Sequence, residues 1–159
     1  MRIGLDEIAL TSAGPLYGVL VKVGLTETLT FVSGFVYGPA AGFVTGSLII
    51  VTSDLFILPG PWTPFIAAII GLLGLLAGII RRLHGEPTLR LLLVSAATLT
   101  LMSEFLQNMW FALFFAVPIA GAMAAGVPSL ITALINNLIL FTTLGPRIVK
   151  LLRESTLKP

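Results

Sequence analysis

The side chains best able to do chemistry in this sequence are three carboxylates placed inside long apolar stretches, Glu27, Asp54 and Glu104. A carboxylate within a membrane is costly, and no Lys or Arg lies in the same stretches to neutralise it. A rise of about 1.5 Å per residue places all three in the outer half of the membrane. Their burial without a counter-charge indicates a function. The alternative is that each simply reaches up to the lipid headgroups.

Further polar and aromatic residues are expected at a similar depth, namely Gln107, Asn108, Asn136, Asn137, Trp62 and Trp110. Glu104, Gln107 and Asn108 stand at positions i, i+3 and i+4, which places them on one helix face. Together these residues predict an outward-facing pocket with acceptors, amide donors and stacking surfaces. The alternative for the paired asparagines is that they only hold helices together.

The chemistry of such a pocket favours a cationic or donor-rich ligand, because carboxylates lack a nearby cation and tryptophans suit a planar ring. A ligand with its own carboxylate would need an Arg or Lys, and only Lys22 is expected near the external side. We therefore expect a heteroaromatic cation rather than an anion.

The sequence contains few of the residue types that catalytic and metal sites usually require. It contains no Cys and a single histidine, His84, which stands beside Arg81 and Arg82. Thiolate sites, histidine metal sites and the usual nucleophile–base arrangements are therefore missing. A pair of carboxylates made of Asp54 and Glu104 matches no recognisable signature. We predict no enzyme, no metal and no cofactor.

The elements that must position these residues are membrane helices. Hydrophobic residues make up 57% of the 159 residues and charged residues 10%, against about 25% charged in soluble domains. A span needs about 20 apolar residues. We predict an all-α integral membrane protein, a compact single-domain bundle of six transmembrane helices, with five as the alternative. The expected spans are 8–23, 26–37, 40–57, 63–80, 88–115 and 128–144.

Two basic clusters set the expected orientation, one at residues 81–90 and one at residues 147–158. Both should face the cytoplasm by the positive-inside rule. Residues 58–64 and the stretch around 117–127 are then external loops, and Gly145-Pro146 ends the last span. Three spans in the first 57 residues place both termini in the cytoplasm, whereas two would place the N-terminus outside.

Glycines recur at helical spacing in the middle of the chain, and we expect them to pack helices closely rather than to do chemistry. They are Gly34, Gly38, Gly42, Gly46, Gly71, Gly74 and Gly78.

Two stretches resemble a known family, residues 34–46 leading to Ser53-Asp54-Leu55, and residues 136–150. They are similar to the substrate-binding S components of energy-coupling factor transporters. The resemblance implies a six-helix bundle in the cell membrane that captures a vitamin or related micronutrient outside. It also implies delivery inward with a transmembrane coupling subunit and a pair of cytoplasmic ATPase subunits. Ala9 and Ala13 match the family's docking pattern for the coupling subunit.

The sequence has no G-x-x-x-x-G-K-[ST] motif, so ATP hydrolysis would have to come from another chain. The family binds several vitamins, and the acidic residues favour thiamine or a similar cationic ring. Two other functions stay open, a proton- or ion-coupled carrier that uses Glu104 as its titrating group, and a structural subunit that binds no small molecule. We expect the lipid bilayer as a partner and no nucleic acid.

Overall fold

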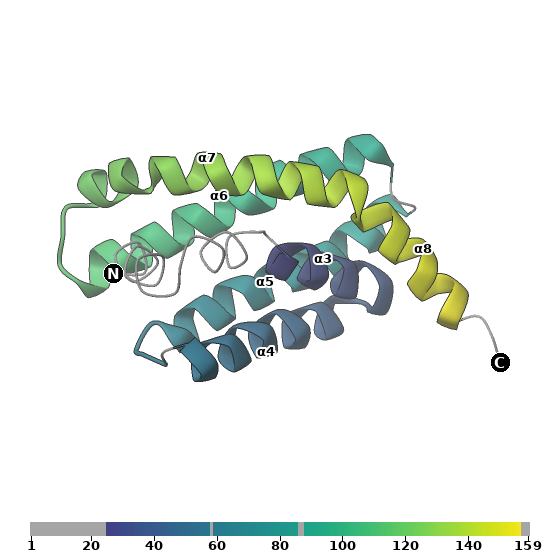
Figure 1. Ribbon diagram of the computed structural model, residues 1–159, viewed down its shortest axis with the longest axis horizontal. Helices are drawn as coiled ribbons and strands as arrows, with labels where there is room; N and C mark the ends of the chain where they lie inside the picture. The colour runs from purple at the N-terminus through teal and green to yellow at the C-terminus, as the bar shows by residue number, and fades with distance from the viewer. Residues whose placement is uncertain (1–24, 58, 86–87, 157–159) are drawn as a thin grey trace.

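The computed structural model describes residues 25–57, 59–85 and 88–156. Within these ranges the chain is helical and has no strand, as predicted. The helices are α3 (Leu25–Tyr37), α4 (Pro39–Ile57), α5 (Thr63–His84), α6 (Leu89–Phe114), α7 (Ile119–Thr143) and α8 (Gly145–Thr156) (Figure 1). Four segments are long and apolar enough to cross a membrane, Pro39–Phe56, Thr63–His84, Leu89–Phe114 and Ile119–Leu151. The protein is therefore a helical, membrane-embedded protein.

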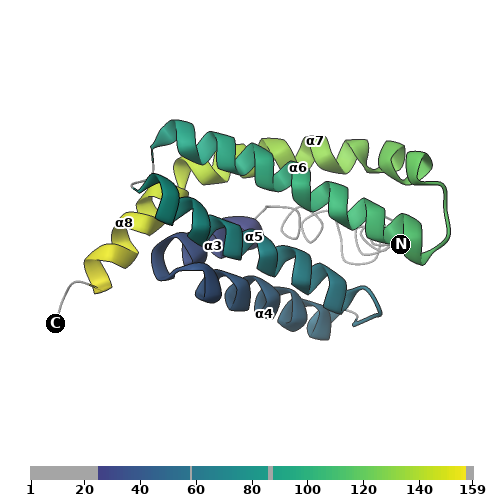
Figure 2. The same cartoon turned by 180° about the vertical axis from the view of Figure 1, so that it is seen from behind.

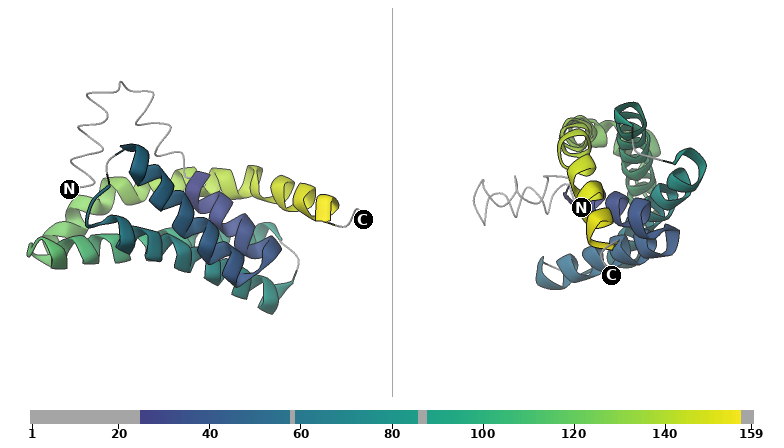
Figure 3. Two further views of the ribbon diagram at one scale, coloured as in Figure 1. Left: turned by 90° about the horizontal axis from the view of Figure 1, so that it is seen from below. Right: turned by 90° about the vertical axis from the view of Figure 1, so that its right-hand side faces the viewer.

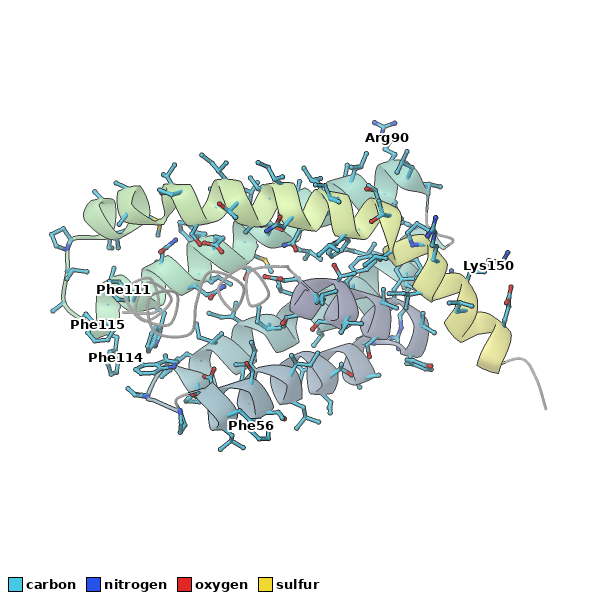
Figure 4. All side chains as sticks on the ribbon, viewed as in Figure 1. Phe56, Arg90, Phe111, Phe114, Phe115 and Lys150 are labelled. Carbon is cyan, nitrogen blue, oxygen red and sulfur yellow. The ribbon has the colours of Figure 1, made fainter. Side chains whose placement is uncertain are left out.

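The long helices lie side by side and alternate in direction (Figures 1 and 2). The α4–α5 and α6–α7 connections lie at one end of the bundle, which we call the aromatic end after Phe65, Trp110, Phe114 and Phe115. The α5–α6 connection and α8 lie at the other end, which we call the basic end after Arg82, Arg90, Arg147 and Lys150. Figure 4 shows labelled members of both groups at opposite ends of the molecule.

The bundle consists of two parts. Helices α3, α4 and α5 pack extensively on one another, and α6 and α7 form a helical hairpin, while α5 and α6 share a smaller contact. The end-on view in Figure 3 shows the two parts as neighbouring groups. Phe31 and Phe35 of α3 and Phe141 of α7 are fully buried between them. Helix α8 packs against α3 and α7.

The predicted spans correspond to observed helices in the described part of the chain. The expected spans 26–37, 40–57 and 88–115 agree closely with α3, α4 and α6, and the span 63–80 continues to His84 in α5. Helix α3 has 13 residues, or about 20 Å, and begins midway along the bundle (Figure 1). The expected span 8–23 lies outside the described residues, so a bundle of six spans stays a prediction.

The predicted external loop around residues 117–127 and the start of the last span at residue 128 are wrong. Helix α7 begins at Ile119 and contains Pro128 within it. A proline removes one backbone donor, which membrane helices tolerate, and the preceding residues are apolar, with four alanines and two glycines between Ile119 and Val127. The helix therefore starts nine residues earlier than expected. Residues in its C-terminal half consequently lie farther from the start of the helix than the sequence predicted.

The basic tail is a helix rather than an irregular segment. Gly145-Pro146 ends α7 as predicted, but the chain starts α8 at once. A proline in the first turn of a helix loses no hydrogen bond, because the first backbone donors have no helical partner. Gly145-Pro146 therefore both ends α7 and begins α8.

The predicted glycines pack helices closely, with the exception of Gly38. Gly34 of α3, Gly42 of α4 and Gly74 of α5 bring three backbones into contact, since a side-chain carbon on any of them would overlap a neighbouring backbone. Gly38 has a different role, because its φ of 100° favours glycine. It ends α3 and lets the chain reverse into Pro39 at the start of α4.

Candidate functional site

A stripe of polar residues on α6 faces α7. Thr100, Glu104 and Asn108 are spaced by four residues and share one helix face. At one end of the stripe, the Asn137 amide nitrogen on α7 donates to the Thr100 hydroxyl at 2.8 Å. At the other end, the Asn108 side chain lies against Gly126 of α7. Glu104 is half-buried between these two contacts.

We call Thr100, Glu104, Asn108 and Asn137 the α6–α7 polar stripe. The structure thus brings together three of the predicted site residues, Glu104, Asn108 and Asn137. Glu104, Gln107 and Asn108 all lie within helix α6, so the spacing i, i+3 and i+4 places them on neighbouring positions of one helix surface.

The Asn137 amide is buried and only partly satisfied. Its side chain is 1% exposed, and its carbonyl oxygen accepts no hydrogen bond from the residues that the structure describes. A hydroxyl can donate or accept, so turning the amide over would keep the Thr100 bond and leave the other amide atom without a partner. A buried group in this state costs about 1–3 kcal/mol.

Helix α3 contributes a second buried oxygen at the same level. Phe31 contacts Phe141, with ring centroids 4.8 Å apart, and α3 and α7 run in the same direction (Figure 1). One turn earlier on each helix are Thr28 and Asn137, which are therefore level with each other. The Thr28 hydroxyl is also fully buried and has no partner among the described residues. Glu27, next to Thr28, is half-buried.

These polar residues lie nearer the middle of the bundle than expected. Asn137 is 18 residues from the first residue of α7, or about 27 Å, and not the 12 Å that a start at Pro128 implied. Glu27 also belongs to mid-depth, because α3 begins midway along the bundle (Figure 1). The predicted outer-half position is therefore wrong for Asn136, Asn137 and Glu27.

Asp54 lies at the aromatic end and holds a turn. Its side chain is 6% exposed and accepts a hydrogen bond from the Thr63 hydroxyl at 2.6 Å. The Gly60 backbone N–H donates to the same hydroxyl at 3.1 Å. Helix α4 packs on α3 and α5, without a comparable contact on α6. Asp54 therefore joins α4 to the start of α5 and does not stand with Glu104.

Replacing Asp54 by alanine should lower stability by about 1–3 kcal/mol, because the Thr63 hydroxyl, which itself accepts from the Gly60 backbone N–H, loses its acceptor. Thermal unfolding of the purified protein in detergent measures the effect. Thr63→Val should cost a similar amount, and the double variant little more than either single change. Fully additive losses would show that Asp54 acts through something other than this turn.

Three other predicted site residues, Gln107, Trp62 and Asn136, do not belong to the stripe. The Gln107 amide donates to the Ser103 hydroxyl at 2.8 Å, on its own helix. Trp62 immediately precedes α5 and packs over Gly60 and against the apolar core. Asn136 is half-buried, next to fully buried Asn137.

Trp110 belongs to the aromatic end. Its ring lies 5.2 Å from that of Phe65 and 5.0 Å from that of Phe114, and Figure 4 shows Phe111, Phe114 and Phe115 at this end of the bundle. Trp110 is six residues beyond Glu104 on α6, or about 9 Å. The aromatic residues therefore form a cluster where membrane proteins often carry aromatic belts.

Two hydroxyls of the site were missed by sequence reasoning, Thr28 and Thr100. Threonine is common in apolar helices, and the only signal was position, since Thr100 stands four residues before Glu104 and Thr28 follows Glu27. The Thr30 hydroxyl is buried too, with no hydrogen-bond partner in the described part of the chain, but Thr30 lies against Gly46 of α4 and so faces away from the stripe.

The predicted docking residues Ala9 and Ala13 lie outside the described residues. No family model, curated protein or solved structure matches this chain.

Proposed function

We propose that this membrane protein binds a small, donor-rich solute between α3, α6 and α7 and passes it inward as the S component of an energy-coupling factor transporter. The observation that carries the binding part is the buried Asn137 carbonyl oxygen, which accepts no hydrogen bond from the described residues and is level with the Thr28 hydroxyl. A ligand donor would satisfy this acceptor and remove the free-energy cost of leaving it unpaired. In a protein that binds no ligand at this place, the acceptor would stay unpaired and its free-energy cost would remain.

The charge distribution supports a donor-rich or cationic ligand. Glu27 and Glu104 are the acidic residues of the middle of the bundle, and the described Lys and Arg residues all follow position 80 and lie in its basic end or in α8. A half-buried carboxylate within a membrane protein favours a cation or a strong donor. We therefore propose a cationic heteroaromatic micronutrient, such as thiamine or a precursor, as the ligand.

The proposed setting is the cell membrane, with a transmembrane coupling subunit and a pair of cytoplasmic ATPase subunits as partners. The support for this part is the resemblance of residues 34–55 and 136–150 to S components, together with the absence of a phosphate-binding loop in the sequence. Four candidate spans and short connections in the described chain suit a subunit that works inside the bilayer.

The test is a thermal-shift screen of the detergent-purified protein against vitamins and their precursors. A ligand at 100 times its dissociation constant should stabilise the protein by about 2.7 kcal/mol. Glu104→Gln keeps the shape and the hydrogen-bonding capacity but removes the charge, so affinity for a cation should fall about tenfold. Asp54→Asn is the matched control, since it changes a carboxylate outside the stripe, and it should keep the ligand shift.

A structural subunit is the second candidate, and it is favoured by a specific observation. Three predicted site residues already bond within the chain, namely Asp54 to Thr63, Gln107 to Ser103 and Asn137 to Thr100. Such bonds between helices stabilise bundles without any ligand. In that case no compound shifts the unfolding temperature, and both carboxylate variants change only the stability of the protein alone.

A further inference from the structure

The basic end of the bundle gathers positive charge from several helices. Arg82 of α5, Arg90 of α6, and Arg147 and Lys150 of α8 are all exposed, and Figure 4 shows Arg90 and Lys150 at this end. Among the described residues, the one acidic side chain here is Glu154, 3.9 Å from Lys150 with both side chains exposed. An exposed pair of this kind neutralises little of the surface.

Helix α8 has two different faces. Val149 is 2% exposed and, with Ile148, packs against the apolar core. The opposite face carries Arg147 and Lys150, with Leu151 one turn beyond Arg147 and 64% exposed. Cations next to an exposed apolar residue are typical of a helix that lies in the membrane interface.

Exposed apolar side chains also occur on the other helices at the basic end. Tyr37 at the end of α3, Leu83 at the end of α5 and Leu89 at the start of α6 are each more than half exposed. All three stand at the helix ends next to the basic residues. Water solvates such a mixture poorly, whereas the headgroup region of a bilayer accommodates both cations and apolar groups.

We propose that the basic end binds anionic phospholipid headgroups, with Arg147 and Lys150 as the principal phosphate contacts and Leu151 inserted among the upper acyl groups. Charge complementarity identifies the partner, because a cluster of several Lys and Arg residues beside membrane spans attracts anionic lipid. Arg81 is not included among the proposed lipid contacts, because its guanidinium lies over the Phe35 ring, 5.3 Å from the ring centroid. This proposal does not depend on the function of the polar stripe.

The test is native mass spectrometry of the full chain, titrated in detergent with phosphatidylglycerol or phosphatidylcholine of the same acyl chains. Each exposed cation should contribute about fivefold to the preference for the anionic lipid, so Arg147→Gln/Lys150→Gln should reduce it about 25-fold. The charge-preserving exchange Arg147→Lys/Lys150→Arg should keep the preference. Inorganic phosphate should not displace the lipid, because the apolar contact is missing.

Arg90→Gln provides a separate measurement on another helix, with an expected loss of about fivefold. It remains informative if the α8 double variant does not fold. Equal retention of the two lipids by the unmodified protein would overturn the proposal. The same conclusion would follow if the folded glutamine variants kept the full preference for phosphatidylglycerol, or if inorganic phosphate displaced it completely.

Discussion

Gly74→Ala should destabilise the bundle by about 3 kcal/mol, at the upper end of the cost of overpacking. The added carbon would lie 2.8 Å from Gly42 Cα and closer still to the Gly42 carbonyl group. These are backbone atoms of a neighbouring helix, which cannot rotate away as a side chain can. Helices α4 and α5 would have to separate, and the contact of both with α3 at Gly34 would open too. Thermal unfolding and size-exclusion profiles in detergent measure the effect.

Two other glycines provide matched controls. At Gly121 on α7 an added carbon meets nothing within 4 Å, so Gly121→Ala should leave stability unchanged or raise it slightly through helix propensity. At Gly71 the nearest atoms belong to the Ser47 and Phe43 side chains, which can shift, so Gly71→Ala should cost less than Gly74→Ala. Equal unfolding temperatures for the Gly74 and Gly121 variants would contradict the close backbone packing.

Much of the helical arrangement could be predicted from sequence, because membrane spans are set by length and by exclusion of charge. Helices α4, α5 and α6 begin close to where the apolar stretches begin. The start of α7 could not be predicted, since Pro128 is a helix stop in water and a tolerated residue in a membrane helix. Helix α8 was missed because its charges were interpreted as a tail, although its apolar residues follow helical spacing.

The candidate site was predictable where its residues share one helix. Glu104 and Asn108 are related by helical geometry alone, so their common face follows from the sequence. Asp54 could not be assigned this way, because its partner Thr63 is brought to it by the turn between α4 and α5. The pairing of Asn137 with Thr100 depends on how α6 and α7 align, which the early start of α7 changes.

Asn137→Leu should weaken binding of the solute about 100-fold or more, because it would leave a ligand donor buried without an acceptor. Its effect on the protein alone should be small. Leucine has a similar size, the unpaired amide oxygen disappears, and the Thr100 hydroxyl can bond instead to a backbone carbonyl of its own helix. Isothermal titration or ligand-dependent thermal shifts measure the affinity, with the compound identified by the screen.

A double-mutant cycle with Thr100 separates the two roles of Asn137. Thr100→Val removes the hydroxyl that accepts from the Asn137 amide, so it should destabilise the protein by about 1–2 kcal/mol. Adding Asn137→Leu should recover most of this loss, because an apolar pair of the same shape replaces both bonding partners. If Asn137 only joins α6 to α7, the variants should change the unfolding temperature as described. In that case no compound should stabilise the wild-type protein. Wild-type affinity in the Asn137→Leu variant would exclude its carbonyl oxygen as a ligand contact.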